Sequence, residues 1–109
     1  MIAASLAMLL GGVAQPTAGT GLPNPEFDHA ARCRVHTELL LAVFYETPKR
    51  KAWGQKIFAY WVKRSDKLGL RAGFTEEALP TRYWLIPVTS DMDFINGCID
   101  KARKDGLKP

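Results

Sequence analysis

Residues 24–48 have the sequence NPEFDHAARCRVHTELLLAVFYETP, and this stretch decides the fold. Each end of the stretch has a residue that can cap a helix followed by a proline. These pairs are Asn24 with Pro25 and Thr47 with Pro48. Asn and Thr side chains cap the first turn of helices, and proline is favoured at the first helical position. The stretch therefore predicts one helix at its start and a second helix at its end.

The two predicted helices cover residues 25–45 and 48–68, with Gly69 ending the second. Their connection is very short, which predicts an antiparallel helical hairpin. Each helix also places a line of residues on one face at helical spacing, so that this face is expected to meet the core. The lines are Cys33, Thr37, Leu40 and Phe44 in the first helix, and Ile57, Trp61 and Leu68 in the second.

Residues 70–89 hold weaker signals. One or two helical turns are predicted over residues 75–79, capped by Thr75 and ended by Pro80. The apolar run at residues 83–86 has no second strand to pair with. We therefore expect it to lie over the core as an extended or short helical segment.

A third long helix is predicted near the C-terminus. Ser90 followed by Asp93 approximates a capping box, and the helix is expected to run to about residue 105, with Gly106 as its terminator. The residues that share one side of this helix are Ile95, Cys98, Ile99 and Ala102.

The chain contains two cysteines, Cys33 and Cys98, and both are predicted on core-facing sides of helices. An even cysteine count in an exported chain indicates a disulfide. Closing so long a loop stabilises a small domain by about 4 kcal/mol. The predicted fold class is therefore all-α, a small three- to four-helix bundle (helical hairpin plus C-terminal helix) stapled by one disulfide. Residues 27–105 form the single domain and residues 106–109 a C-terminal tail.

Residues 1–25 contain no charged side chain, whereas the rest of the chain is densely charged. An apolar run at residues 2–10 precedes two glycines and then small residues, the order found in secretory signals, although no positive charge follows Met1. We predict a signal peptide over residues 1–18, cleaved after Ala14 or Ala18, and a flexible leader over residues 19–26. The run is too short to span a membrane, so no transmembrane segment is expected in the mature chain.

This signal predicts an exported protein, periplasmic or secreted, and one alternative stays open. The same residues suit a buried Ala/Leu helix of a cytosolic protein with reduced cysteines and a metal site. Intact mass distinguishes the two, because only export removes the N-terminal residues and oxidises the thiols.

The best candidate for a binding surface is the helix at residues 48–68. The chain has a net charge of +4, and residues 49–67 concentrate basic side chains against one carboxylate, Asp66. Four lysines form a stripe beside two aromatic rings, the residues being Lys49, Trp53, Lys56, Tyr60, Lys63 and Lys67. Such a face suits phosphates, anionic lipid headgroups or acidic proteins, and nucleic acid is the partner we least expect. The alternative is a solvated outer face with the rings at the core margin.

Residues 39–45, from Leu39 to Tyr45, are apolar on all sides of the predicted helix. Such a segment is either buried on several sides or shared with a second copy of the chain. The segment thus predicts a possible homo-oligomer interface.

His29, Cys33 and His36 fall within one arc of the first helix, and Cys98 would complete a Cys2His2 zinc set. This hypothesis competes with the disulfide, because the same sulfurs cannot serve both. An oxidising compartment favours the disulfide, so no metal or cofactor is expected.

No nucleophile with a neighbouring base stands out for catalysis. The leading prediction is a non-enzymatic exported domain that acts by binding a protein or an anionic surface. The alternative is a small exported hydrolase or metal-dependent enzyme using His29 and His36.

Overall fold

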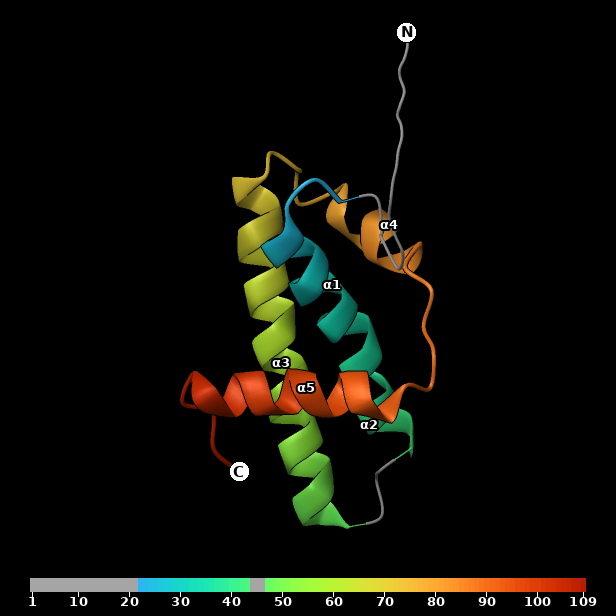
Figure 1. Ribbon diagram of the computed structural model, residues 1–109, viewed down its shortest axis with the longest axis vertical. Coiled ribbons are helices and arrows are strands. Elements are labelled where there is room, and N and C mark those ends of the chain that lie inside the picture. Colours follow the sequence, from blue (N-terminus) through green and yellow to red (C-terminus); the bar gives the residue numbers. More distant parts are fainter. Residues whose placement is uncertain (1–21, 44–46) are drawn as a thin grey trace, which may run out of the picture.

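A computed structural model describes residues 22–43 and 47–109 of the protein. Within these residues the secondary structure is entirely helical (Figure 1). The order is α1 (Pro25–Thr37), α2 (Leu39–Val43), α3 (Pro48–Arg71), α4 (Leu79–Trp84) and α5 (Met92–Lys104). The predicted all-α bundle is confirmed, and so is the disulfide that staples it.

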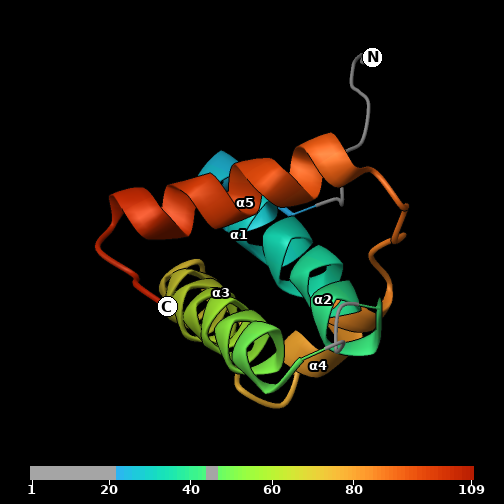
Figure 2. The same ribbon diagram turned by 90° about the horizontal axis from the view of Figure 1, so that it is seen from below.

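The helices α1 and α3 form the predicted antiparallel pair, and the other helices cover it on two sides. Figure 2 shows α5 across one side of the pair and α4 on the opposite side. Both predicted caps are present. The Asn24 side chain accepts hydrogen bonds from the amides of Glu26 and Phe27, and Thr47 accepts one from the amide of Arg50.

The first predicted helix was wrong in one respect, because it is interrupted at Glu38 rather than continuous to residue 45. The Thr37 hydroxyl donates to the carbonyl oxygen of Cys33 at 2.7 Å, and such back-bonding tends to bend helices. The chain restarts as α2, which packs on α3 at Gly54. A Cβ on Gly54 would lie 3.6 Å from the Cβ of Leu40, an ordinary contact distance, so the two helices lie close together at this point.

The predicted end of the second helix was wrong, because α3 continues past Gly69 to Arg71. Gly69 is buried in the helix, where it makes room for Leu79 and Phe27. The true stop is Gly73, which has a φ of 99°. The amide of Gly73 bonds to the carbonyl of Leu70, and that of Phe74 to the carbonyl of Gly69, the pattern of a Schellman motif.

The prediction for residues 75–89 also needs correction. Thr75 does cap a turn, because its hydroxyl accepts from the amide of Ala78. Pro80, however, lies in the first turn of α4 instead of ending a helix, since proline has no amide hydrogen to lose there. Tyr83 and Trp84 are consequently helical, which agrees with the short helical segment, one of the two conformations expected for this run.

The last helix runs to Lys104 and is terminated by Gly106 as predicted, but its N-cap is Asp91 rather than Ser90. The Asp91 carboxylate accepts from the amide of Phe94 at 3.1 Å. At the other end Gly106 has a φ of 105°, and the amide of Leu107 bonds to the carbonyl of Ala102. The tail therefore turns back toward α3.

The core forms where α1, α3 and α5 meet. Trp61 is fully buried, and its indole nitrogen donates to the carbonyl of Cys98 at 3.2 Å. Cys33 and Cys98 form the disulfide beside it, with Cα atoms 5.6 Å apart. Residues 65 positions apart are thus joined, and α1 is tied covalently to α5.

The predicted signal peptide, residues 1–18, and most of the predicted leader lie outside the described residues. Within residues 22–43 and 47–109, no helix is both long and apolar enough to cross a membrane.

Candidate functional site

The predicted binding surface lies along α3. Its four lysines are exposed and its two aromatic rings are half-buried. The lysines are Lys49, Lys56, Lys63 and Lys67, and the rings belong to Trp53 and Tyr60. Their spacing keeps them on one side of the helix, away from the buried residues Ile57 and Trp61.

The Tyr60 hydroxyl is engaged within the protein, which the sequence did not indicate. It donates a hydrogen bond to the Asp105 carboxylate at the end of α5. Burial of the ring and this bond raise the pKa of Tyr60 to about 12. The same bond lowers the pKa of Asp105, because it favours the ionised carboxylate. Tyr60 is therefore an anchor for α5 as well as part of the surface.

The C-terminal tail adds to this surface and was missed by the sequence analysis. The Lys56 ammonium donates to the carbonyl oxygen of Lys108 at 3.1 Å. A shallow hollow of about 520 Å³ lies between α3 and the tail, lined in part by Tyr60, Lys63 and Leu107. The turn at Gly106 and the bond from Lys56 to Lys108 direct the tail here, and the second of these was not predictable from local signals.

Carboxylates on or beside α3 are bound to other groups, and Asp105, which accepts from Tyr60, also pairs with Lys101 at 3.5 Å. Asp66 pairs with Arg34 at 2.9 Å and accepts the Tyr83 hydroxyl at 2.8 Å. Glu26 pairs with Arg64 at 3.0 Å. In the described part of the chain, no carboxylate forms an ion pair with Lys63 or Lys67.

The predicted interface at residues 39–45 lies only partly within the described residues. The side chains of Leu39 and Leu41 are half-buried, and Leu40 is 7% exposed. Leu40 also lines an apolar hollow of about 210 Å³ with Trp53 and Ile99. The side chains of residues 42–46 are outside the described part, so an oligomer interface stays a prediction.

Three of the four residues considered as zinc ligands lie close together in the structure. Ligand atoms of His29, Cys33 and Cys98 all lie within 4.8 Å of one another, and the His29 Nε2 atom is 3.6 Å from the Cys33 sulfur. The disulfide occupies both sulfurs, so this arrangement offers no thiolate ligands. Burial and the charge of Arg32 lower the pKa of His29.

His36 does not join this cluster. Its Nδ1 atom donates to the carbonyl oxygen of Arg32 at 2.7 Å, and its Nε2 atom accepts from the amide of Thr89 at 3.2 Å. His36 is 4% exposed. Its role in the structure is to hold the segment between α4 and α5 against α1.

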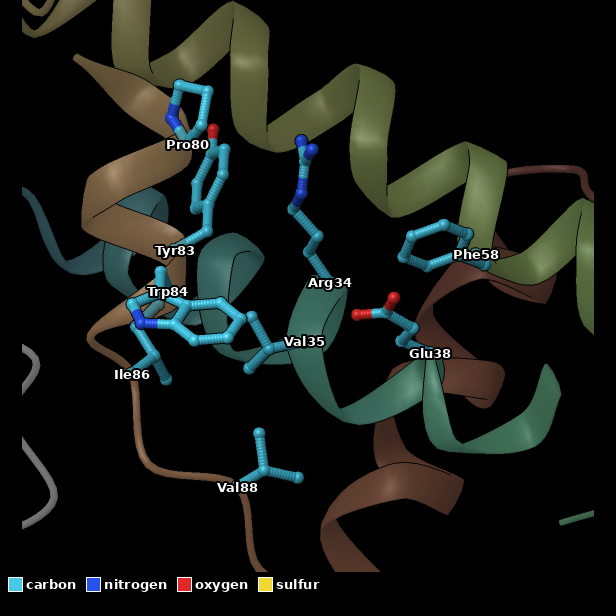
Figure 3. A pocket seen from close by; sticks show the side chains of 9 residues that line it. All are labelled: Arg34, Val35, Glu38, Phe58, Pro80, Tyr83, Trp84, Ile86 and Val88. Carbon is cyan, nitrogen blue, oxygen red and sulfur yellow. The ribbon is translucent and has the colours of Figure 1, made fainter. Parts of the chain in front are cut away.

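The structure also has a groove that the sequence did not predict. It has a volume of about 390 Å³ and lies between α1, α3 and the end of α4 (Figure 3). Its lining is mainly aromatic and aliphatic, and consists of Arg34, Val35, Glu38, Phe58, Pro80, Tyr83, Trp84, Ile86 and Val88. The apolar run at residues 83–86 was the available signal, but it was expected to cover the core. Tyr83 and Ile86 do so, whereas Trp84 is 86% exposed.

No protein-family model, curated protein or solved structure matches this chain. Exposed ammonium groups on one helix side attract and hydrogen-bond anionic groups, and an apolar groove takes apolar side chains. Both features are suited to binding.

Proposed function

We propose that this protein is an exported helical domain that acts by binding, with the basic side of α3 contacting an acidic protein partner. The observation that carries this proposal is that the ammonium groups of Lys63 and Lys67 are exposed and form no ion pair in the described part of the chain. The nearby carboxylates Asp66 and Glu26 pair with arginines, and Asp105 pairs with Lys101. The charge of the two lysines is consequently available to a partner, which would steer and orient its approach.

A protein partner is favoured over a membrane because the apolar side of α3 is buried in the core of the protein. Ile57, Trp61 and Leu68 are buried in the core, so α3 has no second apolar side to insert among lipids. Interfacial membrane helices need one. The stripe from Lys49 to Lys67 spans about 27 Å at 1.5 Å per residue, a length suited to an acidic protein surface.

Export is supported by the disulfide and by the uncharged N-terminal residues. Disulfides form and persist in oxidising compartments such as the periplasm and the extracellular space. Cys33 and Cys98 form one in this chain. The composition of residues 1–18 is the second support, because it follows the order of a secretory signal.

A charge-reversal experiment tests the proposal. Binding to immobilised poly-L-glutamate is measured for the wild-type protein, for the double variant Lys63→Glu/Lys67→Glu, and for the control Lys51→Glu/Arg82→Glu. The control makes the same change in net charge away from the stripe. We expect the test variant to bind about tenfold more weakly or worse and the control to change less, with wild-type affinity falling as salt increases.

Two outcomes would overturn the proposal. One is binding that is indifferent to salt, and the other is an equal loss in test and control variants. Anionic phospholipid vesicles are assayed beside the polypeptide. Stronger binding to the vesicles, lost in the test variant, would assign the stripe to membranes instead.

A further inference from the structure

We propose that the groove of Figure 3 is a second binding site, which takes a polypeptide segment presenting a large apolar side chain next to a lysine or arginine. This site is separate from the basic side of α3. It differs from that surface in chemistry, because its walls are apolar and its accessible charge is negative.

The exposed apolar side chains at the groove are the first observation. Trp84 is 86% exposed and Val88 is 46% exposed, and both line it. Folding of the monomer leaves these side chains in water, and clustered exposure of this kind marks interaction surfaces. Tryptophan is also enriched among the residues that dominate binding energy.

The shape of the groove is the second observation. Figure 3 shows the Trp84 indole extending toward Val35 on α1, with Phe58 on α3 forming the opposite wall. Its volume of about 390 Å³ lies within the range of ligand sites, and it is open along one side. A large aliphatic or aromatic side chain of a partner can enter between these walls.

The charge of the groove determines the polar part of the partner. The Arg34 guanidinium stacks 4.0 Å from the centre of the Tyr83 ring, and its Nη1 atom pairs with Asp66 at 2.9 Å. Its positive charge is therefore offset within the protein. Glu38 is exposed, and its carboxylate has no ion-pair partner in the described part of the chain.

A cation on the partner thus meets two favourable groups, the Glu38 carboxylate and the exposed indole face of Trp84. An adjoining hollow shares Arg34 and Tyr83 with the groove and adds the carboxylates of Asp66 and Glu76. Carboxylates consequently outnumber guanidinium groups over the combined surface. An acidic partner would be repelled here, although it is the partner favoured at α3.

Arg34 still has hydrogen atoms to donate to the partner's backbone. Its Nε and Nη2 atoms take no internal hydrogen bond, and in the described residues no buried side-chain nitrogen lacks a hydrogen-bond partner. These two donors therefore reach solvent. A backbone carbonyl oxygen can accept from them without carrying a charge.

The test uses a synthetic amphipathic helix of leucine and lysine as the probe, and a helix of leucine and glutamate of equal length for comparison. Binding is measured with the full chain by calorimetry. Trp84→Ala and Glu38→Gln are the test variants. Leu85→Ala and Glu77→Gln are matched controls, because both residues are exposed but neither lines the groove.

We expect the lysine helix to bind and the glutamate helix not to bind at this site. Trp84→Ala should weaken binding about tenfold or more and Glu38→Gln about fivefold, with both controls unchanged. Lys63→Glu/Lys67→Glu should retain binding, which separates this site from the α3 surface. Circular dichroism checks that every variant keeps its helix content and Tm.

Equal binding of both helices, or wild-type binding by Trp84→Ala, would overturn the proposal. Sedimentation velocity of the protein alone addresses a second copy of the chain as the occupant. A dimer that Trp84→Ala dissociates would assign the groove to self-association and would likewise overturn it.

Discussion

His29 is the residue whose environment gives a pH-dependent prediction. Its ring makes edge contacts with the rings of Trp61 and Phe94, with centroids at 5.6 and 6.0 Å, and lies next to the disulfide, while part of the residue stays exposed. Burial and the Arg32 charge lower its pKa from the ordinary value of 6.5. The unfolded chain therefore binds a proton at His29 more readily than the folded protein does.

Stability should consequently fall as the pH drops through the window below 6.5 and should be fully retained above it. NMR titration of the ring protons is expected to give a His29 midpoint below 6.5, and denaturation at pH 7.5 and pH 5 gives the stability change. His29→Gln should reduce the pH dependence. A His29 midpoint at or above 6.5 would contradict this account.

Two other residues make contacts with partners far away in the sequence, which a local pattern does not predict. Tyr60 was predicted as a ring beside the lysine stripe, and it is there, but its bond to Asp105 joins positions 45 residues apart. His36 was considered as a metal ligand or enzyme residue, and its contact with Thr89 instead links α1 to the segment before α5. Neither partner is visible in the sequence around the residue, because only packing of the helices brings them together.

The helices themselves were predictable wherever their ends depend on neighbouring residues. The Asn24 and Thr47 caps and the stop at Gly106 are of this kind. Gly69 was mistaken for a stop because glycine often ends helices, whereas here its lack of a Cβ makes room for Phe27 and Leu79, which a local pattern does not contain. The caps at Asn24 and Thr47 and the stop at Gly106 were therefore predicted correctly. The break at Glu38, the N-cap at Asp91 and the place of Pro80 in the first turn of α4 were not.

Substitution by alanine should have opposite effects on stability at two glycines within helices, Gly69 and Gly97. A Cβ at Gly69 would lie 2.9 Å from the Cζ atom of the fully buried Phe27. Overpacking exceeds the gain in helix propensity, so we expect Gly69→Ala to destabilise the protein by about 1–2 kcal/mol.

Gly97 in α5 has nothing within 4 Å of an added Cβ. Gly97→Ala should therefore stabilise the protein by about 0.5–1 kcal/mol through helix propensity. Urea denaturation of both variants checks the pair. Stabilisation by Gly69→Ala would show that Gly69 is not held in close contact with Phe27.

At the scale of the whole molecule, the disulfide was predictable because periodicity places both cysteines on core-facing sides of their helices. The binding surfaces were predictable only in part. The stripe on α3 lies within one helix, so its geometry follows from spacing alone. The groove combines residues of α1, α3 and α4 with the segment after α4, and no local pattern brings these together.

The disulfide also explains how so short a chain maintains these surfaces. It ties α1 to α5 across a sequence separation of 65, which stabilises the fold by about 4 kcal/mol in the chain-entropy description. That is a large share of the 5–15 kcal/mol typical of folded domains. The positions of Tyr60 and Lys56 beside the α5 tail depend on the same tie.

The most direct test of an exported, disulfide-stapled domain is the intact mass of the protein recovered from the periplasm or medium, before and after iodoacetamide treatment without reductant. We predict a chain that begins at residue 15 or residue 19, has lost two hydrogen atoms relative to its reduced form, and gains no alkyl group. An uncleaved chain that becomes alkylated at both Cys33 and Cys98 would contradict the account.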